Sequence, residues 1–101
     1  MMIGKYIREL REDRGMVLRE LAAALSIDSA QLSKMERGQR FFREDDLKVL
    51  SKVLKTSYET LYTKWLADRA LKVTENNKLQ SKALELALSV CKNDKMNYDS
   101  K

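Results

Sequence analysis

The chain has 101 residues, a net charge of +5, three glycines, no proline, no histidine and one cysteine. This length supports one modest hydrophobic core and is too short for two, and a hydrophobic content of 44% argues against disorder. A single cysteine excludes an internal disulfide, and the chain has neither a signal-peptide core nor an apolar run near the ~20 residues that span a bilayer, so we expect a cytoplasmic protein with no membrane partner.

The charge is unevenly distributed along the chain. Residues 1–46 contain nine basic and nine acidic residues, so the excess lies further on. The local pattern is more informative, because Lys34, Arg37, Arg40 and Arg43 are spaced three residues apart. Such a run is either a solvated helix face or part of a nucleic-acid interface, and the spacing alone does not separate the two.

The first half of the chain predicts three short helices. Apolar residues repeat at helical spacing from Ile3 to Leu10, and this helix is expected to end near Gly15. A second stripe runs from Leu18 to Leu25. After the break at "SID", Asp28 is placed to cap a third helix of about residues 29–37, with Gln31 at the position from which a capping box reaches back.

Three further helices are expected in the second half. Acidic residues 44–46 suit the first turn of a fourth helix, whose apolar face includes Leu47 and Leu50. A fifth helix begins near Tyr58, and a sixth carries an apolar pattern from Leu79 to Val90. Cys91 continues this pattern, and we expect it to be a buried small hydrophobe. The end, residues 93–101, has no periodicity and is expected to fray.

The abrupt restart after "SID" favours a helix-turn-helix. Only Leu32 and Met35 are strongly apolar in the third helix, so a narrow stripe would hold it while its polar surface faces outward. Such a helix fits a DNA major groove, which is about 12 Å wide. A plain helical bundle is the competing interpretation.

The segments "IRELREDRG", "LRELAAALSID", "LSKMERG" and "LKVLSKVLKTS", in this order, resemble the Cro and phage-repressor (XRE-like) helix-turn-helix family. The resemblance covers residues 3–66. It implies an all-α fold, with a five-helix repressor-like DNA-binding domain over residues 1–70 and an additional C-terminal helix and tail over residues 71–101. It also implies a sequence-specific, double-stranded DNA-binding transcriptional regulator that inserts helix 3 into the major groove as a dimer.

The same resemblance assigns roles to individual residues. Ser29, Ala30 and Lys34 would face base edges, and Gln31 and Ser33 would flank them. The expected phosphate contacts are Leu18, Arg19, Arg37, Arg40 and Arg43. Arg11 and Glu36 resemble the structural ion pair that ties the family's first helix to the end of its third.

Two departures from the family pattern stand out. Val17 and Leu18 replace a capping Ser or Thr and a DNA-contacting Gln, so only the backbone N–H at this helix start would meet a phosphate. The loop "GQRFF" lacks the proline that is common there and carries two adjacent aromatic residues, Phe41 and Phe42. They would stack on a sugar or, as we expect, pack beneath the fourth helix.

The fifth helix is expected to form a homodimer interface, because it has more apolar surface than a small core absorbs and because Trp and Tyr are common at interfaces. This interface would consist of Tyr58, Leu61, Tyr62, Trp65 and Leu66. The sixth helix would either extend the interface or seal the monomer.

The sequence offers little chemistry for an enzyme. Without histidine or clustered cysteine no ordinary zinc site can form, and no glycine-rich phosphate loop is present, so we expect no catalysis, metal, cofactor or small-molecule ligand. Within the DNA-binding interpretation, an autoregulatory protein of the restriction–modification controller type and a phage-type repressor both stay open. The alternative function is an antitoxin-like or adaptor helix-turn-helix whose main partner is another protein.

Overall fold

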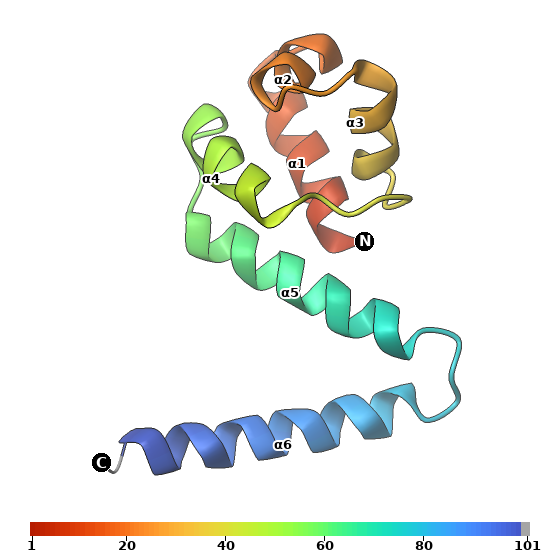
Figure 1. Ribbon diagram of the computed structural model, residues 1–101, viewed down its shortest axis with the longest axis vertical. Coiled ribbons are helices and arrows are strands. Elements are labelled where there is room, and N and C mark those ends of the chain that lie inside the picture. Colours follow the sequence, from red (N-terminus) through yellow and green to blue (C-terminus); the bar gives the residue numbers. More distant parts are fainter. Residues whose placement is uncertain (100–101) are drawn as a thin grey trace. The chain divides into compact units, whose positions relative to one another are not determined.

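The computed structural model describes the backbone of residues 1–99 and the side chains of residues 1–94. Within this part the chain forms helices and no strand, which confirms the expected all-α fold (Figure 1). The helices are α1 (Met2–Asp13), α2 (Leu18–Ala24), α3 (Ser29–Glu36), α4 (Glu44–Val53), α5 (Tyr58–Thr74) and α6 (Gln80–Asp99). The chain divides into two compact units, residues 1–68 and 69–101, with the boundary inside α5.

Glycines end two of the helices of the first unit, the first of them at the expected Gly15. After α1, Gly15 takes a left-handed φ of 65°, and the N–H of Met16 donates back to the Arg11 carbonyl (3.0 Å). After α3, Gly38 has a φ of 77°, and the N–H of Gln39 donates to Lys34 (2.9 Å). Both are Schellman endings, which satisfy carbonyls that the helix leaves open.

Carboxylates mark the starts of three helices. Asp28 accepts a hydrogen bond from the Gln31 N–H (2.7 Å) at the start of α3, as expected, although the Gln31 side chain makes no return bond. In α2 and α4 the carboxylate lies three residues inside the helix and reaches back, Glu20 to the Val17 N–H (2.9 Å) and Asp46 to the Arg43 N–H (2.9 Å). The side chains of Val17 and Arg43 contain no acceptor, so each start has one half of a capping box.

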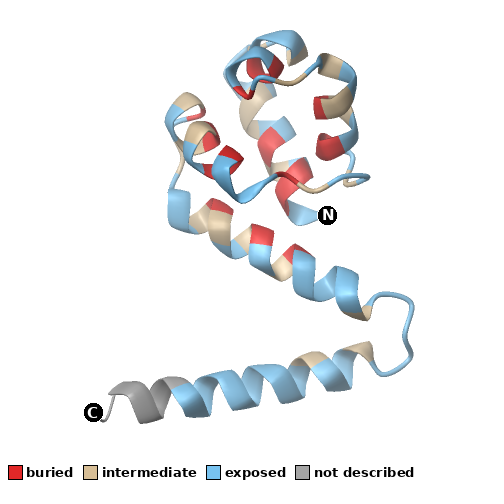
Figure 2. Ribbon diagram, in the orientation of Figure 1, coloured by how far each residue is buried: buried red, intermediate tan, exposed pale blue. Residues whose placement is uncertain are grey.

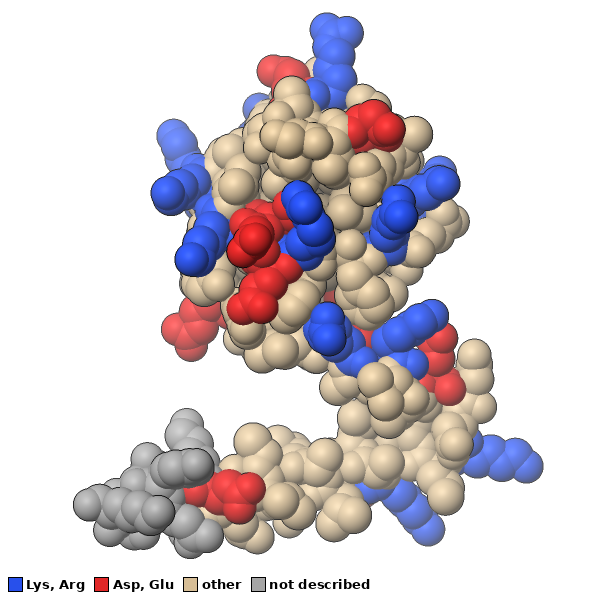
Figure 3. Space-filling view, viewed as in Figure 1, with Lys and Arg blue, Asp and Glu red and all other residues tan. Residues whose placement is uncertain are grey.

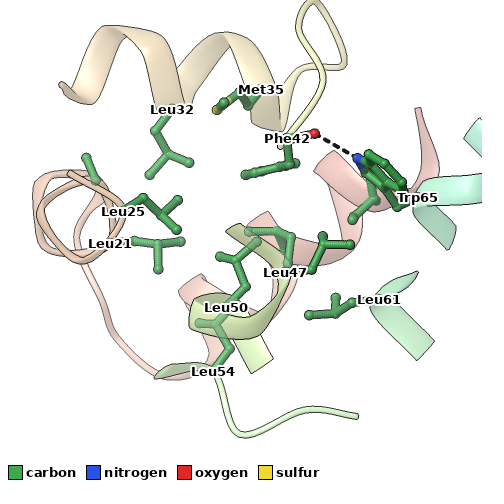
Figure 4. Packing of buried hydrophobic residues seen from close by; sticks show 13 residues of the cluster. Leu21, Leu25, Leu32, Met35, Phe42, Leu47, Leu50, Leu54, Leu61 and Trp65 are labelled. Carbon is green, nitrogen blue, oxygen red and sulfur yellow. Dashed lines mark hydrogen bonds between the residues drawn. The ribbon is translucent and has the colours of Figure 1, made fainter. Parts of the chain in front are cut away.

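One hydrophobic core lies inside the first unit (Figures 2 and 4). α3 packs against α1 and α2, and α2 also packs against α4. The core residues are Ile3, Ile7, Leu21, Ala22, Leu25, Leu32, Met35, Phe42, Leu47, Leu50, Leu54, Leu61 and Trp65. The apolar stripes expected on the first four helices therefore converge on a single core.

Two residues assigned to a dimer interface belong to this core instead. Leu61 is fully buried and Trp65 is 6% exposed, and the Trp65 indole N–H donates to the Phe42 carbonyl (2.7 Å; Figure 4). The interface prediction is wrong for these two residues, because both side chains belong to the core of the first unit. Tyr58 and Leu66 are exposed and Tyr62 is half-buried, so their interface role stays a prediction.

The start of α1 is held by a residue 66 positions away. The buried Asp68 carboxylate on α5 accepts hydrogen bonds from the N–H groups of Met2 and Ile3, both at 2.9 Å. These are among the donors that a helix start leaves without an intrahelical partner. Asp68 thus caps α1 and holds the part of α5 that belongs to the first unit against the start of α1.

The second unit is more exposed than expected. α6 continues to Asp99, so the expected fraying is wrong for residues 93–99, which contain neither glycine nor proline; residues 100 and 101 lie outside the described part. Cys91 is exposed rather than buried, because no described residue covers that part of α6. The apolar pattern of α6 correctly indicated an apolar helix face, but that face is not buried.

Candidate nucleic-acid interface

The turn between α2 and α3 is short, with four residues between the two helices. Ser26 takes a φ of 58°, and the Ile27 N–H donates to the Ala22 carbonyl (3.0 Å). This is a Schellman ending with serine at the position where glycine is usual. It reverses the chain in so few residues that α3 leaves in a new direction, which explains the break at "SID".

The α3 helix has a buried side and an exposed side. Leu32, Met35 and Glu36 are buried against the core, while Ala30 and Lys34 are exposed. The other residues expected to contact bases, Ser29, Gln31 and Ser33, are half-buried. The helix is therefore attached by a narrow stripe, and a polar surface about two turns long remains available.

An ion pair joins α1 to the end of α3. The Arg11 guanidinium donates through Nε to Glu36 Oε2 (2.8 Å) and through Nη2 to Glu36 Oε1 (3.0 Å), and its Nη1 donates to the Met16 carbonyl (2.9 Å). The two side chains are only 11% and 4% exposed. The hydrogen bond to Glu36 raises the pKa of Arg11 above its usual value. A bidentate, buried pair of this kind fixes the angle of α3.

Four of the five residues expected to contact phosphate present exposed guanidinium groups. Arg19 lies on α2, Arg37 directly follows α3, Arg40 lies in the next loop and Arg43 precedes α4. Basic side chains project from the edge of the first unit where α3 and this loop lie, as well as from other parts of the same face (Figure 3). The side chain of the fifth residue, Leu18, packs against the core, so of this residue only the backbone N–H is left for the expected phosphate contact.

The loop after α3 divides its two aromatic residues between different surroundings. Phe42 is buried in the core, as expected. Phe41 is half-buried and lines a hollow of about 360 Å³ together with Gln31, Arg40 and Arg43. The structure thus brings one expected base-contacting residue and two expected phosphate-contacting residues to the edge of one hollow.

Some residues that position the site were not found from the sequence. Gly4 is the clearest: a Cβ there would collide with the backbone carbonyl of Met35 and come within 2.7 Å of the Glu36 oxygen. α1 and α3 are therefore in direct backbone contact. A glycine within an apolar helical stripe was the only available signal, since such a glycine often marks close approach of two backbones.

The described side chains include no cluster of His, Cys, Asp or Glu that could hold a metal ion. In the same part of the chain, no helix has the length and apolar character needed to cross a membrane.

Comparison with known proteins agrees with this geometry. Residues 3–61 match the family model described as a helix-turn-helix domain. The chain is similar to the uncharacterised HTH-type transcriptional regulator RghRB of Bacillus subtilis, with 41% identity over 59 residues, 57% of this chain and 42% of the relative. It is also similar to an uncharacterised HTH-type transcriptional regulator of Mycobacterium tuberculosis, with 37% identity over 61 residues, 60% of this chain and 44% of the relative.

The chain spans less than half the length of these relatives. No solved structure matches it. Both relatives are named as transcriptional regulators.

Proposed function

This chain belongs to the helix-turn-helix domain family, and we propose that it is a sequence-specific DNA-binding transcriptional regulator. The observation that carries the proposal is the two-sided α3. Leu32, Met35 and the Arg11–Glu36 pair hold one side, and Ala30 and Lys34 are exposed on the other. A rigidly held helix with a polar outer surface is what readout in the major groove requires.

The two kinds of contact have separate sources in this arrangement. Residues 29–34 of α3 would meet base edges, with Lys34 donating to guanine O6 and N7. The exposed Arg19, Arg37, Arg40 and Arg43 would bind phosphates, which sets the register on the duplex without reading the sequence. The Leu18 N–H at the start of α2 would add a backbone contact.

We further propose that the protein acts as a homodimer. One α3 presents only a few side chains to bases, so two copies on half-sites one helical turn apart would supply a specific site. As the narrower role we propose autoregulation, as in a restriction–modification controller.

The test is fluorescence anisotropy of the full chain against DNA from upstream of its own gene, in a salt series with a scrambled competitor. Tight binding that discriminates against the competitor and weakens steeply with salt is expected, because several cations would displace counterions from phosphates. Absence of binding even at low salt would overturn the proposal and favour the alternative role, in which the main partner is another protein.

A further inference from the structure

We propose that α6 pairs with α6 of a second copy of this chain in antiparallel orientation, through four residues that we call the α6 stripe: Leu79, Ala83, Leu86 and Val90. Leu79 immediately precedes α6, and its carbonyl already accepts a hydrogen bond from the Ala83 N–H (2.9 Å). The leucines and the valine are 61%, 67% and 50% exposed. Spacings of four, three and four residues place the stripe along one face, as in helices that pair lengthwise.

The hydrogen bonds between α6 and the end of α5 involve a different side of α6. The Gln80 amide donates to the Thr74 hydroxyl (3.2 Å) and to the Leu71 carbonyl (3.4 Å), and Leu84 is half-buried. Gln80 and Leu84 lie about 100° around the helix from Leu79 and Ala83. Leu79 and Ala83 line an open hollow together with Val73 and Thr74 at the end of α5, and Leu86 and Val90 are exposed beyond it. Exposed apolar surface of this kind marks an interaction site.

The order of side chains in the stripe makes it complementary to itself. In an antiparallel pair centred between residues 84 and 85, Leu79 lies opposite Val90 of the second copy and Ala83 lies opposite its Leu86. Each large side chain at the centre thus meets a small one, which is how facing helices interdigitate. A parallel pair would instead set alanine against alanine and leave a gap. A two-fold contact uses the same stripe on both copies.

The ends and edges of the stripe agree with this pairing. A hollow of about 250 Å³, lined by Val73, Leu79 and Ala83 among others, lies at the end where Val90 of the second copy would arrive. At the edges, Lys82 would face Ser89 of the second copy and Asp94 would face its Gln80. No like charges are therefore opposed, and Glu85 and Lys92 point away from the stripe.

This assignment deepens the proposed function, since it names the surface that makes the dimer, but it is tested without DNA. The experiment is sedimentation equilibrium of the full chain and of Leu86→Lys. The matched control is Leu88→Lys, because Leu88 is also exposed (54%) and lies about 160° around the helix from Leu86. Circular dichroism checks that both variants keep their helices.

The wild type and Leu88→Lys are expected to be dimers, and Leu86→Lys is expected to weaken the dimer about tenfold or more, because it places two ammonium groups in the apolar contact. A monomeric wild type, or equal loss in both variants, would overturn the proposal. Leu66→Lys, a substitution on α5, is measured in the same way. If this variant alone is monomeric, the interface lies on α5 and the proposal is wrong.

Cross-linking tests the orientation. In a Cys91→Ser background, a mixture of the Leu79→Cys and Val90→Cys proteins is expected to form a disulfide readily, while either protein alone is not, because its two cysteines would be about 16 Å apart along the axis. Efficient cross-linking of each protein alone would indicate a parallel pair. If the dimer forms as described but no variant binds DNA, the proposed function fails and this inference stands.

Discussion

Lys34 and Arg40 carry the same charge but differ in where the fold places them. Lys34 is exposed on the outer surface of α3, between the buried Leu32 and Glu36. Arg40 lies in the loop after α3, at the edge of the hollow that Phe41 lines. The first position suits readout of a base, and the second suits contact with a phosphate.

Lys34→Ala is expected to reduce affinity for the specific site about 5- to 150-fold, as the loss of one good base contact does, and to change nonspecific affinity much less. The reason is that only a correctly placed base edge accepts the lost hydrogen bonds. The measurement is anisotropy against the specific and the scrambled duplex.

Arg40→Ala is the matched comparison. It is expected to weaken binding to both duplexes by similar factors and to lower the slope of log affinity against log salt by about 1, because one phosphate contact is lost. If Lys34→Ala left the discrimination between duplexes intact, α3 would not be the recognition helix.

Gly4 decides how closely α1 and α3 approach. Ala is normally favoured over Gly in a helix by about 1 kcal/mol. Gly4→Ala should nevertheless destabilise the protein, by about 2 kcal/mol, because the new Cβ would collide with the backbone oxygens of Met35 and Glu36. Urea unfolding measures the difference.

Gly15→Ala provides a control with a different cause. A Cβ at Gly15 would meet nothing within 4 Å, so only its left-handed φ of 65° would be penalised, at about 1 kcal/mol. A Gly4→Ala protein as stable as the wild type would show that α1 and α3 can separate without cost.

At the scale of helices, α1 and α5 are coupled through one side chain. Asp68 is buried and accepts from the N–H groups of Met2 and Ile3, so it serves as the missing cap of α1. Met1 precedes the helix and offers no side-chain cap. The stability of the first turn of α1 therefore depends on the position of α5.

Asp68→Ala is expected to cost about 3 kcal/mol, since it leaves two amide groups without an acceptor in a partly or fully buried place. Amide hydrogens in the first turns of α1 should exchange faster than those of α4 in the same protein. Asp68→Asn keeps one acceptor oxygen and is expected to lose less. Equal exchange in α1 and α4 after the alanine substitution would contradict the coupling.

At the scale of the whole molecule, the proposed dimer makes a prediction about its DNA site. Two recognition helices related by a two-fold axis should contact half-sites about 10 base pairs apart. Inserting about 5 base pairs between the half-sites turns one of them to the opposite face of the duplex, and we expect binding to fall to that of a single half-site. Unchanged affinity, measured by anisotropy, would indicate that each copy binds alone.

The helices and most of the core were predictable because their signals are local. The apolar stripe of α1, the Asp28 cap and the glycines after α1 and α3 act within a few residues of one another. The same is true of the face of α3, since Leu32 and Met35 are its only strongly apolar residues. Family resemblance added the pairing of Arg11 with Glu36, which no local pattern indicates.

The wrong predictions concern which apolar side chains are buried by other parts of the chain. Trp65 and Leu61 looked available for a partner, but the core of the first unit takes them in. Cys91 looked buried, but no described residue covers it. Helical periodicity shows that a face is apolar and does not show what lies against it.

By itself, therefore, the sequence determined where α1, α2 and α3 begin and end, which faces are apolar, and that α3 carries an outward polar surface. These properties depend on hydrogen bonds and side-chain spacing within one or two turns. Only the tertiary structure decided the backbone contact at Gly4, the cap supplied by Asp68 and the exposure of the α6 stripe. Each of these depends on residues distant in the chain that meet, or fail to meet, once the helices pack.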